Sequence, residues 1–332
     1  MLDKEIENFK KMGIKIKTHT ALGKDLTLDD LFKQGFSAVF LGIGAHKPIS
    51  LGLAEEDAEG VTQGVEYLKN LNLGEPVPKG KHVTVIGGGN VAIDVARAAV
   101  RKGAEQVTIL YRRTLREMPA YTSEIEEALE EGVKISYLTA PESILTQNGH
   151  VAGLRCIKMK LGDPDASGRR RPIPIKGSEY EIKTDLVIPA IGQTMEAPAK
   201  ESIKGIDIVK WGSFKVDAVT LATTRPGVYA GGDAVSGTAT VIEAIAGGKK
   251  AAIAIHAYIN GIEDPKFPPI PQKRADVERI DVSEEKMAQL KRPKIPLLEI
   301  GMRIGTFDQV ELGLSEKVAR DEAKRCLRCD LG

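Results

Sequence analysis

The 332-residue sequence is poor in several residue types, and each shortage excludes a class of protein. It contains only three cysteines, which excludes a secreted scaffold held together by disulfide bonds and favours the reducing cytoplasm. Aromatic residues make up 5% of the chain, and 47 basic residues balance 46 acidic ones, for a formal net charge of +1. Neither figure favours binding to nucleic acid or to an anionic membrane surface.

Hydrophobic runs are short. Residues 37–45 form one of the longer runs, which cannot cross a bilayer, and the charged N-terminal segment is unlike a signal peptide. The hydrophobic fraction of 42% is nevertheless sufficient for a sizeable core, and the length is sufficient for two domains. We therefore expect a cytoplasmic globular protein that binds neither nucleic acid nor membrane.

Helical patterns and buried-strand patterns alternate along most of the chain, which is typical of α/β proteins with parallel sheets. Near the N-terminus the patterns predict a helix at residues 2–11, a strand at 14–18 and a helix at 28–34 that Thr27 caps. Further strands are predicted at residues 37–45, 82–86, 106–111, 133–138, 186–191 and 228–230. Further helices are predicted at 64–71, 124–131, 240–260 and 315–326, and one more begins in the glycine-rich segment from 87 and runs to about 101. Within residues 143–188, apolar and polar residues alternate around a turn-rich segment, which predicts an antiparallel meander.

A glycine-rich turn follows the predicted strand at residues 82–86 and begins a helix. Its spacing, Gly87-x-Gly89-x-x-Ala92, is typical of dinucleotide binding. The first glycine permits the tight turn, the second lets a pyrophosphate approach the backbone, and the alanine keeps the helix close to the strand. The N–H groups at the start of the helix suit phosphate. We predict that the pyrophosphate is bound by Gly87, Gly88, Gly89, Asn90, Val91 and Ala92.

The end of the following strand, residues 106–111, distinguishes NADP from NAD. An acidic residue there would bind the 2′-hydroxyl of the ribose, but Arg112 and Arg113 follow instead, and the first carboxylate is that of Glu117. Two guanidinium groups suit a 2′-phosphate, which arginine can bind with two parallel hydrogen bonds. The pattern favours NADP(H) over NAD(H); the alternative is a solvated basic turn.

A second glycine turn lies at residues 231–234, between a predicted strand and a predicted helix. The Asp233 carboxylate could accept a hydrogen bond from a hydroxyl group, and the helix that follows could face a phosphate or a flavin carbonyl. Turns of this composition are also common in ordinary loops, so the turn alone does not identify a cofactor.

Six segments occur in an informative order: VIGGGNVAIDVAR, ILYRR with EMPA, DASGRRRPIP, VIPAIGQ, GVYAGGDAVSGTATVIEAIAGGKKAA and EAKRCLRC. Together they resemble the NADPH-oxidising small (beta) subunit of glutamate synthase and related FAD- and NAD(P)-dependent oxidoreductase subunits, including the flavin subunits of electron-bifurcating transhydrogenases. The resemblance implies a Rossmann-like NAD(P)-binding domain, with its antiparallel meander, nested in an FAD-binding domain. It also implies further cofactor-binding residues at Gly192, Gly232, Asp233 and Thr240.

The sequence departs from this family at its start, where the cysteine-rich iron–sulfur region and the first FAD-binding segment of family members have no counterpart. The expected domains are the remainder of a truncated FAD-binding domain at residues 1–45 and 223–262, the NADP(H)-binding domain at 46–222, and an extended tail with a C-terminal helix and the Cys326–Cys329 pair at 263–332. We expect FAD to bind in the intact assembly and this chain alone to carry little of it. The apolar strand around residues 39–43 would then be exposed.

The resemblance implies that hydride passes from NADPH to FAD and that electrons continue to iron–sulfur centres or a partner subunit. Candidate partners are the missing N-terminal segment, a larger synthase or electron-transfer subunit, and a second copy of the chain. Because the cofactors carry out the chemistry, no catalytic side chain is predicted. The alternative is a non-catalytic NADP(H)-binding module or a fragment that transfers no electrons by itself.

The cysteines leave alternatives open. Cys326 and Cys329 have the spacing of metal ligands, but two thiolates do not complete a four-cysteine cluster. They could be half of a cluster site completed by a partner, a zinc or redox pair, or a remnant on the surface. Cys156 lies in an alternating strand and is predicted to be a core residue. The basic run at residues 169–171 fits a solvated hairpin tip or a contact with an acidic partner.

Overall fold

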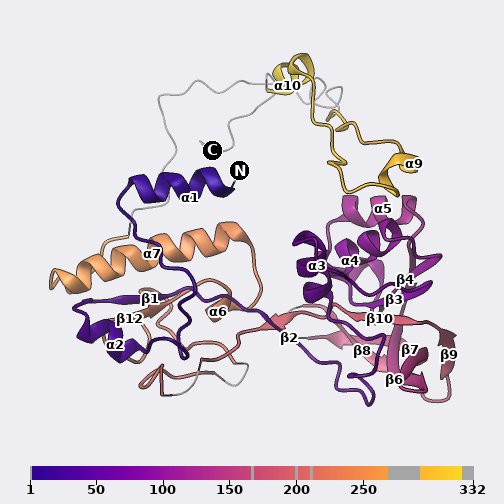
Figure 1. The fold of residues 1–332 in the computed structure, drawn as a ribbon, viewed down its shortest axis with the longest axis horizontal. Helices are drawn as coiled ribbons and strands as arrows, with labels where there is room; N and C mark the ends of the chain where they lie inside the picture. The colour runs from indigo at the N-terminus through magenta and orange to yellow at the C-terminus, as the bar shows by residue number, and fades with distance from the viewer. Residues whose placement is uncertain (1, 166–167, 199–200, 210–211, 268–291, 324–332) are drawn as a thin grey trace. The chain divides into compact units, whose positions relative to one another are not determined.

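The structure, a computed structural model, describes residues 2–165, 168–198, 201–209, 212–267 and 292–323 (Figure 1). The chain divides into two compact units. The first comprises Met1–Lys47 and Gln193–Pro268, and the second comprises Pro48–Gly192 and Pro269–Gly332. Two short strands, β2 (Lys47–Pro48) and β11 (Gln193–Thr194), pair with each other at the boundary. Within the described residues, no helix is both long and apolar enough to cross a membrane.

The second unit is built on a parallel sheet of four strands in the order β10-β3-β4-β5. These strands are β3 (His82–Ile86), β4 (Gln106–Tyr111), β5 (Lys134–Tyr137) and β10 (Leu186–Pro189). Their alternate residues, such as Val83, Val85 and Ile109, form the largest core cluster. A strand covered on both faces reads as a continuous apolar run, which is why the sequence pattern located these strands closely.

Three helices pack against one face of this sheet: α3 (Gly64–Asn72), α4 (Asn90–Arg101) and α5 (Thr122–Glu130). The buried stripe of α4 consists mainly of alanines, including Ala92 and Ala96, each 0% exposed. Small side chains let the helix axis approach the sheet closely, as the dinucleotide-binding pattern requires at Ala92.

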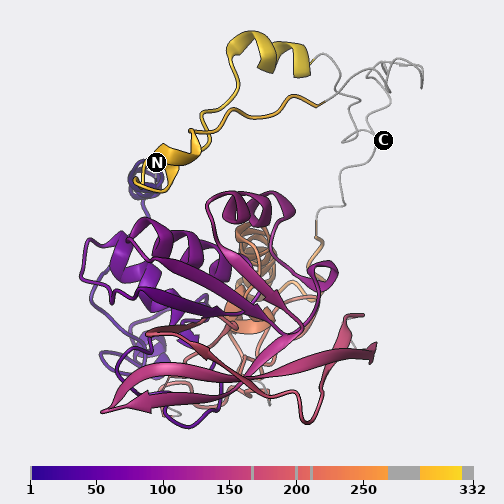
Figure 2. The same cartoon turned by 90° about the vertical axis from the view of Figure 1, so that its right-hand side faces the viewer.

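Antiparallel strands cover the other face of the sheet, as Figure 2 shows. They are β6 (Thr139–Gln147), β7 (His150–Pro164), β8 (Arg170–Pro174) and β9 (Tyr180–Lys183). Strand β7 pairs with each of the other three. The predicted meander is therefore confirmed, although the apolar pattern at residues 180–188 divides into β9 and the parallel strand β10.

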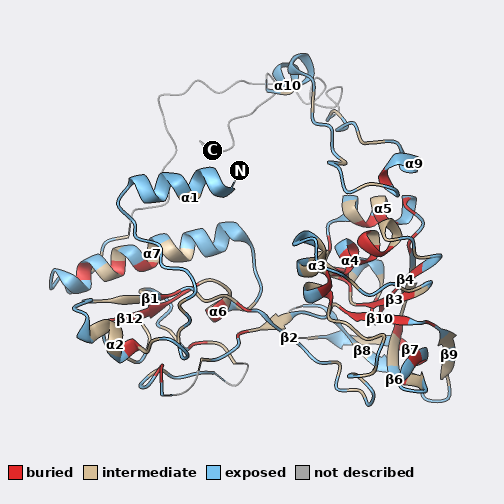
Figure 3. Ribbon diagram, viewed as in Figure 1, coloured by how far each residue is buried: buried red, intermediate tan, exposed pale blue. Residues whose placement is uncertain are grey.

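The first unit contains a two-stranded parallel sheet of β1 (Val39–Leu41) and β12 (Val228–Ala230). Its helices are α1 (Leu2–Lys11), α2 (Leu28–Lys33), α6 (Asp233–Ser236) and α7 (Val241–Ile259). Figure 3 shows that α1 is exposed along its length, whereas α7 buries residues of its C-terminal half. The predicted cap of α2 is confirmed, because the Thr27 hydroxyl accepts a hydrogen bond of 3.2 Å from the Asp30 amide.

Two strand predictions in the first unit were wrong or too long. Residues 14–18 form no strand, and Ile14 and Ile16 are 51% and 49% exposed. A strand needs a neighbour to receive its hydrogen bonds, and none of the described residues supplies one there. The strand predicted at residues 37–45 spans only Val39–Leu41, and the chain takes a positive φ of 71° soon afterwards at Gly44.

The compact units also differ from the predicted domain boundaries. Residues 193–222 belong to the first unit, whereas the sequence placed them in the nested domain of residues 46–222. The reason is packing: Met195, Ile203 and Phe214 form a core cluster with Leu28 and Leu41. These apolar side chains have no periodicity that would reveal which unit receives them.

The C-terminal segment of the second unit includes two short helices, α9 (Ile300–Arg303), which was not predicted, and α10 (Glu316–Ala323), which lies within the helix predicted at residues 315–326. Arg303, 4% exposed, ties this segment to the helical layer. Its guanidinium lies 2.9 Å from the Glu130 carboxylate, and its carbonyl accepts a hydrogen bond of 3.0 Å from Arg101 Nε. Beyond Ala323 the helix predicted at residues 315–326 lies outside the described residues.

Candidate functional site

The glycine-rich turn lies at the carboxyl end of β3, where α4 begins. A Cβ atom added to Gly87, whose φ is +148°, would collide with the carbonyl oxygen of Ala190, and one added to Gly88 would lie 2.5 Å from the Tyr111 ring. A Cβ atom added to Gly89 would meet no atom within 4 Å. The fold itself therefore requires glycine at the first two positions. The third glycine leaves an open space directly beside the start of the helix, where a pyrophosphate could approach.

Hydrogen bonds hold the loop that follows β4 against this turn. The Ala120 amide donates a hydrogen bond of 3.2 Å to the carbonyl of Gly88, and the Tyr121 amide donates one of 3.0 Å to Asn90 Oδ1. The Tyr111 hydroxyl donates a bond of 2.6 Å to the carbonyl of Glu117 within the loop. The loop thus has a defined position relative to the glycine turn. The side chain of Asn90, the first residue of α4, helps to fix that position through its bond to Tyr121. Val91, the next residue, is half-buried.

The two predicted arginines have different environments. Arg113 is 6% exposed, its Nε donates a hydrogen bond of 2.8 Å to the carbonyl of Arg170, and its Nη2 lies 3.1 Å from Asp165 Oδ2. Its guanidinium therefore joins the end of β4 to the hairpin of β7 and β8. Arg112 is exposed, and within the described part of the chain it forms no hydrogen bond or ion pair.

Positive charge surrounds Arg112. Desolvation beside the loop, followed by the charges of Arg113 and Arg169, lowers the pKa of Arg112 from its ordinary value, even though solvent reaches the residue. An arginine remains protonated under such conditions. An anion bound beside Arg112 would relieve the repulsion among these cations, which is the electrostatic property that a 2′-phosphate site needs.

Gly192 lies close to the same edge of the sheet. It follows β10, takes a φ of +119°, and its carbonyl accepts a hydrogen bond of 3.1 Å from the Ile49 amide. Between β10 and Gly192, the Ala190 amide donates a bond of 2.7 Å to the carbonyl of Ile86. This segment forms the wall against which the turn at Gly87 is packed.

The second predicted turn lies in the first unit, after β12. Gly232 has a φ of +65° and precedes the one-turn helix α6. Asp233 Oδ1 accepts a hydrogen bond of 3.2 Å from the Ala239 amide. Thr240 caps α7: its hydroxyl donates to Glu243 at 2.7 Å and accepts from the Glu243 amide at 3.3 Å. The Thr240 hydroxyl is therefore engaged within the protein.

Strand β1 has a free edge in the described part of the chain, because it pairs only with β12. A cavity of about 1170 Å³ lies in this region, lined among others by Leu31, Val39 and Phe40. The Phe40 side chain is 37% exposed, and Val241 and Ile242 at the start of α7 are 76% and 79% exposed. The apolar surface expected around residues 39–43 is present only in part: Phe40 is exposed and Val39 and Ile43 are half-buried, whereas Leu41 is 3% exposed and belongs to a core cluster.

Burial of Cys156 should protect its thiol from chemical modification. Cys156 is 0% exposed in β7, as predicted for a core residue, and burial raises the pKa of its thiol to about 11. At about pH 8 only about one thiol in a thousand would be ionised, and a buried thiol is also shielded from reagents. We expect iodoacetamide to leave Cys156 unmodified in the native protein and to modify it in urea, as measured by peptide mass spectrometry. Rapid native modification would contradict the buried assignment.

Cys326 and Cys329 lie outside the described residues, so the alternatives for that pair stay open. Within the described residues, no group of three or more His, Cys, Asp and Glu side chains is arranged to hold a metal ion.

Sequence reasoning missed two residues that shape the site, Tyr111 and Asp165. The position of Tyr111 at the end of β4 was a usable signal, whereas nothing in the sequence linked Asp165 to Arg113.

Residues 2–248 match the family described as pyridine nucleotide-disulphide oxidoreductase. The chain belongs to this family. Solved structures agree on the fold: the Mycobacterium tuberculosis protein FprA in complex with NADPH superposes with a TM-score of 0.62 at 19% identity, covering 75% of this chain and 70% of that one. The expected mixed α/β fold of two-dinucleotide-binding-domain flavoproteins is confirmed.

Curated relatives are more similar to this chain in sequence than these solved structures are. The chain is 41% identical over 337 residues to the NADP(+)-dependent formate dehydrogenase subunit beta of Moorella thermoacetica, covering 98% of this chain and 46% of the relative. It is 38% identical over 282 residues to the glutamate synthase [NADPH] small chain of Escherichia coli K12, covering 78% and 59%. The resemblance to the glutamate synthase small subunit is confirmed. The chain spans about half the length of the first of these relatives.

Proposed function

We propose that this chain is the NADPH-binding part of a flavin-dependent oxidoreductase that works with partner subunits in the cytoplasm. The observation that carries the proposal is the glycine turn, in which Gly87 and Gly88 are required by packing while Gly89 faces open space. The names of the relatives, an NADP-dependent dehydrogenase subunit and an NADPH-dependent synthase chain, support the same nucleotide. Nicotinamide and flavin supply the redox chemistry, so the chain's own residues bind and orient them.

In this proposal the start of α4 binds the pyrophosphate, and Arg112 binds the 2′-phosphate of NADPH. The exposed guanidinium of Arg112 has its donors available, whereas those of Arg113 are directed to Asp165 and to the carbonyl of Arg170. Arg113 therefore acts as a positioning residue that fixes the loop carrying Arg112. Asn90 has a similar role through its hydrogen bond to Tyr121.

Arg112→Ala tests this assignment. Loss of a charge-assisted contact to the 2′-phosphate should weaken NADPH binding about thirtyfold, which corresponds to about 2 kcal/mol. Binding of NADH should change little, because NADH has no 2′-phosphate. Isothermal titration calorimetry with both nucleotides measures this difference directly.

Lys102→Ala is a suitable control, since it removes one positive charge from the opposite end of α4. NADPH affinity should be nearly unchanged in this variant. Equal affinities of the unmodified chain for NADPH and NADH would show that Arg112 does not recognise a 2′-phosphate.

FAD is the second proposed cofactor, with Gly232, Asp233 and the start of α7 as its contacts in the intact assembly. The chain contains one turn of the Gly-x-Gly-x-x-Ala type, and the proposal assigns it to NADPH. We therefore expect the chain purified alone to show little of the flavin absorbance near about 450 nm. A stoichiometric flavin band would show that these contacts suffice. Electron transfer that returns when the partner subunit is added would distinguish the oxidoreductase from a non-catalytic NADPH-binding module.

A further inference from the structure

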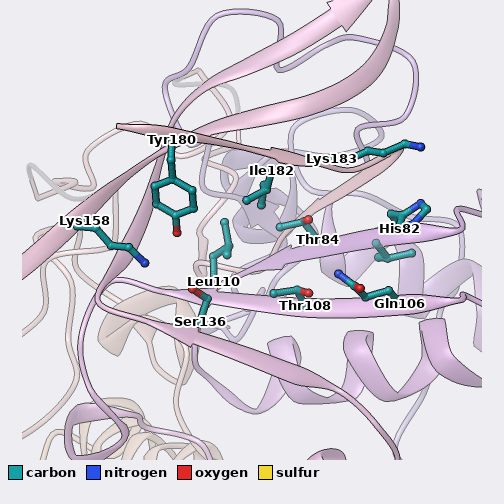
Figure 4. Close-up of a pocket in the computed structure, with 11 residues that line it drawn as sticks. His82, Thr84, Gln106, Thr108, Leu110, Ser136, Lys158, Tyr180, Ile182 and Lys183 are labelled. Carbon is teal, nitrogen blue, oxygen red and sulfur yellow. The ribbon is translucent and has the colours of Figure 1, made fainter. Parts of the chain in front are cut away.

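A polar cavity of about 320 Å³ lies inside the second unit, between the parallel sheet and the meander. Figure 4 shows its lining, which comes from β3, β4 and β5 on one side and from β7 and β9 on the other. The residues of the sheet explain why the layers leave a space here. Toward the carboxyl ends of the strands, Ile86 and Leu110 pack into an apolar cluster with the meander. Leu110 also borders the cavity, together with the polar residues Thr84, Thr108 and Ser136.

Three hydrogen-bond donors are directed to this cavity. Lys158 Nζ points inward, 4.6 Å from the centre of the Tyr180 ring, and within the described residues no carboxylate pairs with it (Figure 4). The Gln106 side-chain oxygen accepts a bond of 3.2 Å from Lys134 Nζ, and within the described residues its amide nitrogen has no hydrogen-bond partner. The Thr108 hydroxyl also lines the space. Among the described residues, two lysines, Lys158 and Lys183, line the cavity and no aspartate or glutamate does. His82 also lines it and lies 3.9 Å from the Asp185 carboxylate.

Hydroxyl groups from both walls also line the cavity: Ser136 on β5 and Tyr180 on β9. They lie 3.1 Å and 3.2 Å from the Thr139 hydroxyl, and either oxygen of each pair can be the donor. The Thr139 hydroxyl also donates to the carbonyl of Tyr137 at 3.1 Å. Because a hydroxyl oxygen can accept a hydrogen bond while its proton is used elsewhere, both Ser136 and Tyr180 can accept one from a ligand in the cavity.

We propose that this cavity binds a small oxyanion that also carries a hydroxyl group, such as a hydroxycarboxylate or a hydrogen phosphate. The anionic oxygens would accept hydrogen bonds from Lys158, Gln106 and Thr108, and the hydroxyl group would donate to Ser136 or Tyr180. The cavity lies along the middle of the strands, whereas the glycine turn follows the carboxyl end of β3. It is therefore a site separate from the proposed nucleotide site.

Calorimetric titration of the full chain with malate, succinate and inorganic phosphate tests the proposal, with NADP⁺ present to occupy the nucleotide site. Malate should bind saturably and more tightly than succinate, which has the same carboxylates but no hydroxyl group. The phosphate titration distinguishes a phosphate ligand from a carboxylate ligand. Lys158→Met should weaken binding about tenfold or more, because it removes a charge-assisted hydrogen bond.

Lys160→Met is the matched control, since Lys160 lies on the same strand and does not line the cavity. It should leave binding unchanged. Thr108→Val, which keeps the side-chain shape, provides a second test if Lys158→Met fails to fold, and it should weaken binding several-fold. Absence of saturable binding for all three anions would overturn the proposal, as would equal affinities of the unmodified chain and the cavity variants.

Discussion

Gly89→Val is expected to reduce the affinity for NADPH by at least about a hundredfold while leaving the fold intact. An added Cβ atom at this position meets nothing within 4 Å, and the φ of −88° is accessible to any residue. The new side chain would instead occupy the space through which the pyrophosphate approaches the start of α4. Loss of about two charge-assisted hydrogen bonds accounts for a change of this size. Calorimetry measures the affinity, and circular dichroism during urea unfolding measures the stability.

Gly87→Val provides the contrasting variant. Its φ of +148° disfavours any other residue, and its Cβ atom would collide with the carbonyl of Ala190, so this variant should lose stability as well as binding. The pair separates a ligand-binding requirement for glycine from a folding requirement. Normal NADPH binding by Gly89→Val would show that the turn does not receive the pyrophosphate, and the proposed function would fail with it.

The second large effect is expected at Glu131, which lies at the centre of a buried charge network. Its side chain is 0% exposed. One carboxylate oxygen lies 2.7 Å from Arg97 Nη2 and 2.9 Å from Arg101 Nη2. Glu131→Ala leaves these two guanidinium groups with fewer anionic partners in a poorly hydrated site. Breaking a buried ion pair in this way costs about 3–5 kcal/mol of the free energy of unfolding.

Urea unfolding followed by circular dichroism measures this loss, with Glu126→Ala as the control. Glu126 lies in α5, the helix that Glu131 caps at its C-terminus, and is exposed, so its replacement should change the free energy of unfolding by no more than about 0.5 kcal/mol. Equal stabilities of the two variants would contradict the importance of the network. Because Arg101 also contacts the Arg303 carbonyl, Glu131→Ala should make residues 292–323 more accessible to protease.

Much of the fold could be predicted from the sequence because its signals are local. The apolar run of β3, the glycine spacing that follows it and the alanine stripe of α4 lie within about twenty neighbouring residues. The same is true of the Thr27 cap, where donor and acceptor are three residues apart. Such signals predicted the glycine turn, the basic end of β4 and the family. The structure places the turn directly after β3 and the two arginines directly after β4, as expected.

Tertiary structure alone decided how the two arginines differ and where the units divide. Arg112 and Arg113 are adjacent residues of the same type, but Arg113 contacts Asp165, 52 residues away, because the hairpin of β7 and β8 meets the end of β4. Residues 193–222 likewise join the first unit because Phe214 finds an apolar partner in Leu28. The strand expected at residues 14–18 is missing because strands depend on neighbours that hydrogen-bond to them. Local sequence therefore determined the strands and helices of the parallel sheet and the glycine spacing that the proposal assigns to NADPH. Contacts between distant residues determined which side chains keep hydrogen-bond donors available for a ligand, because a donor that is already paired inside the protein gains little by changing partner.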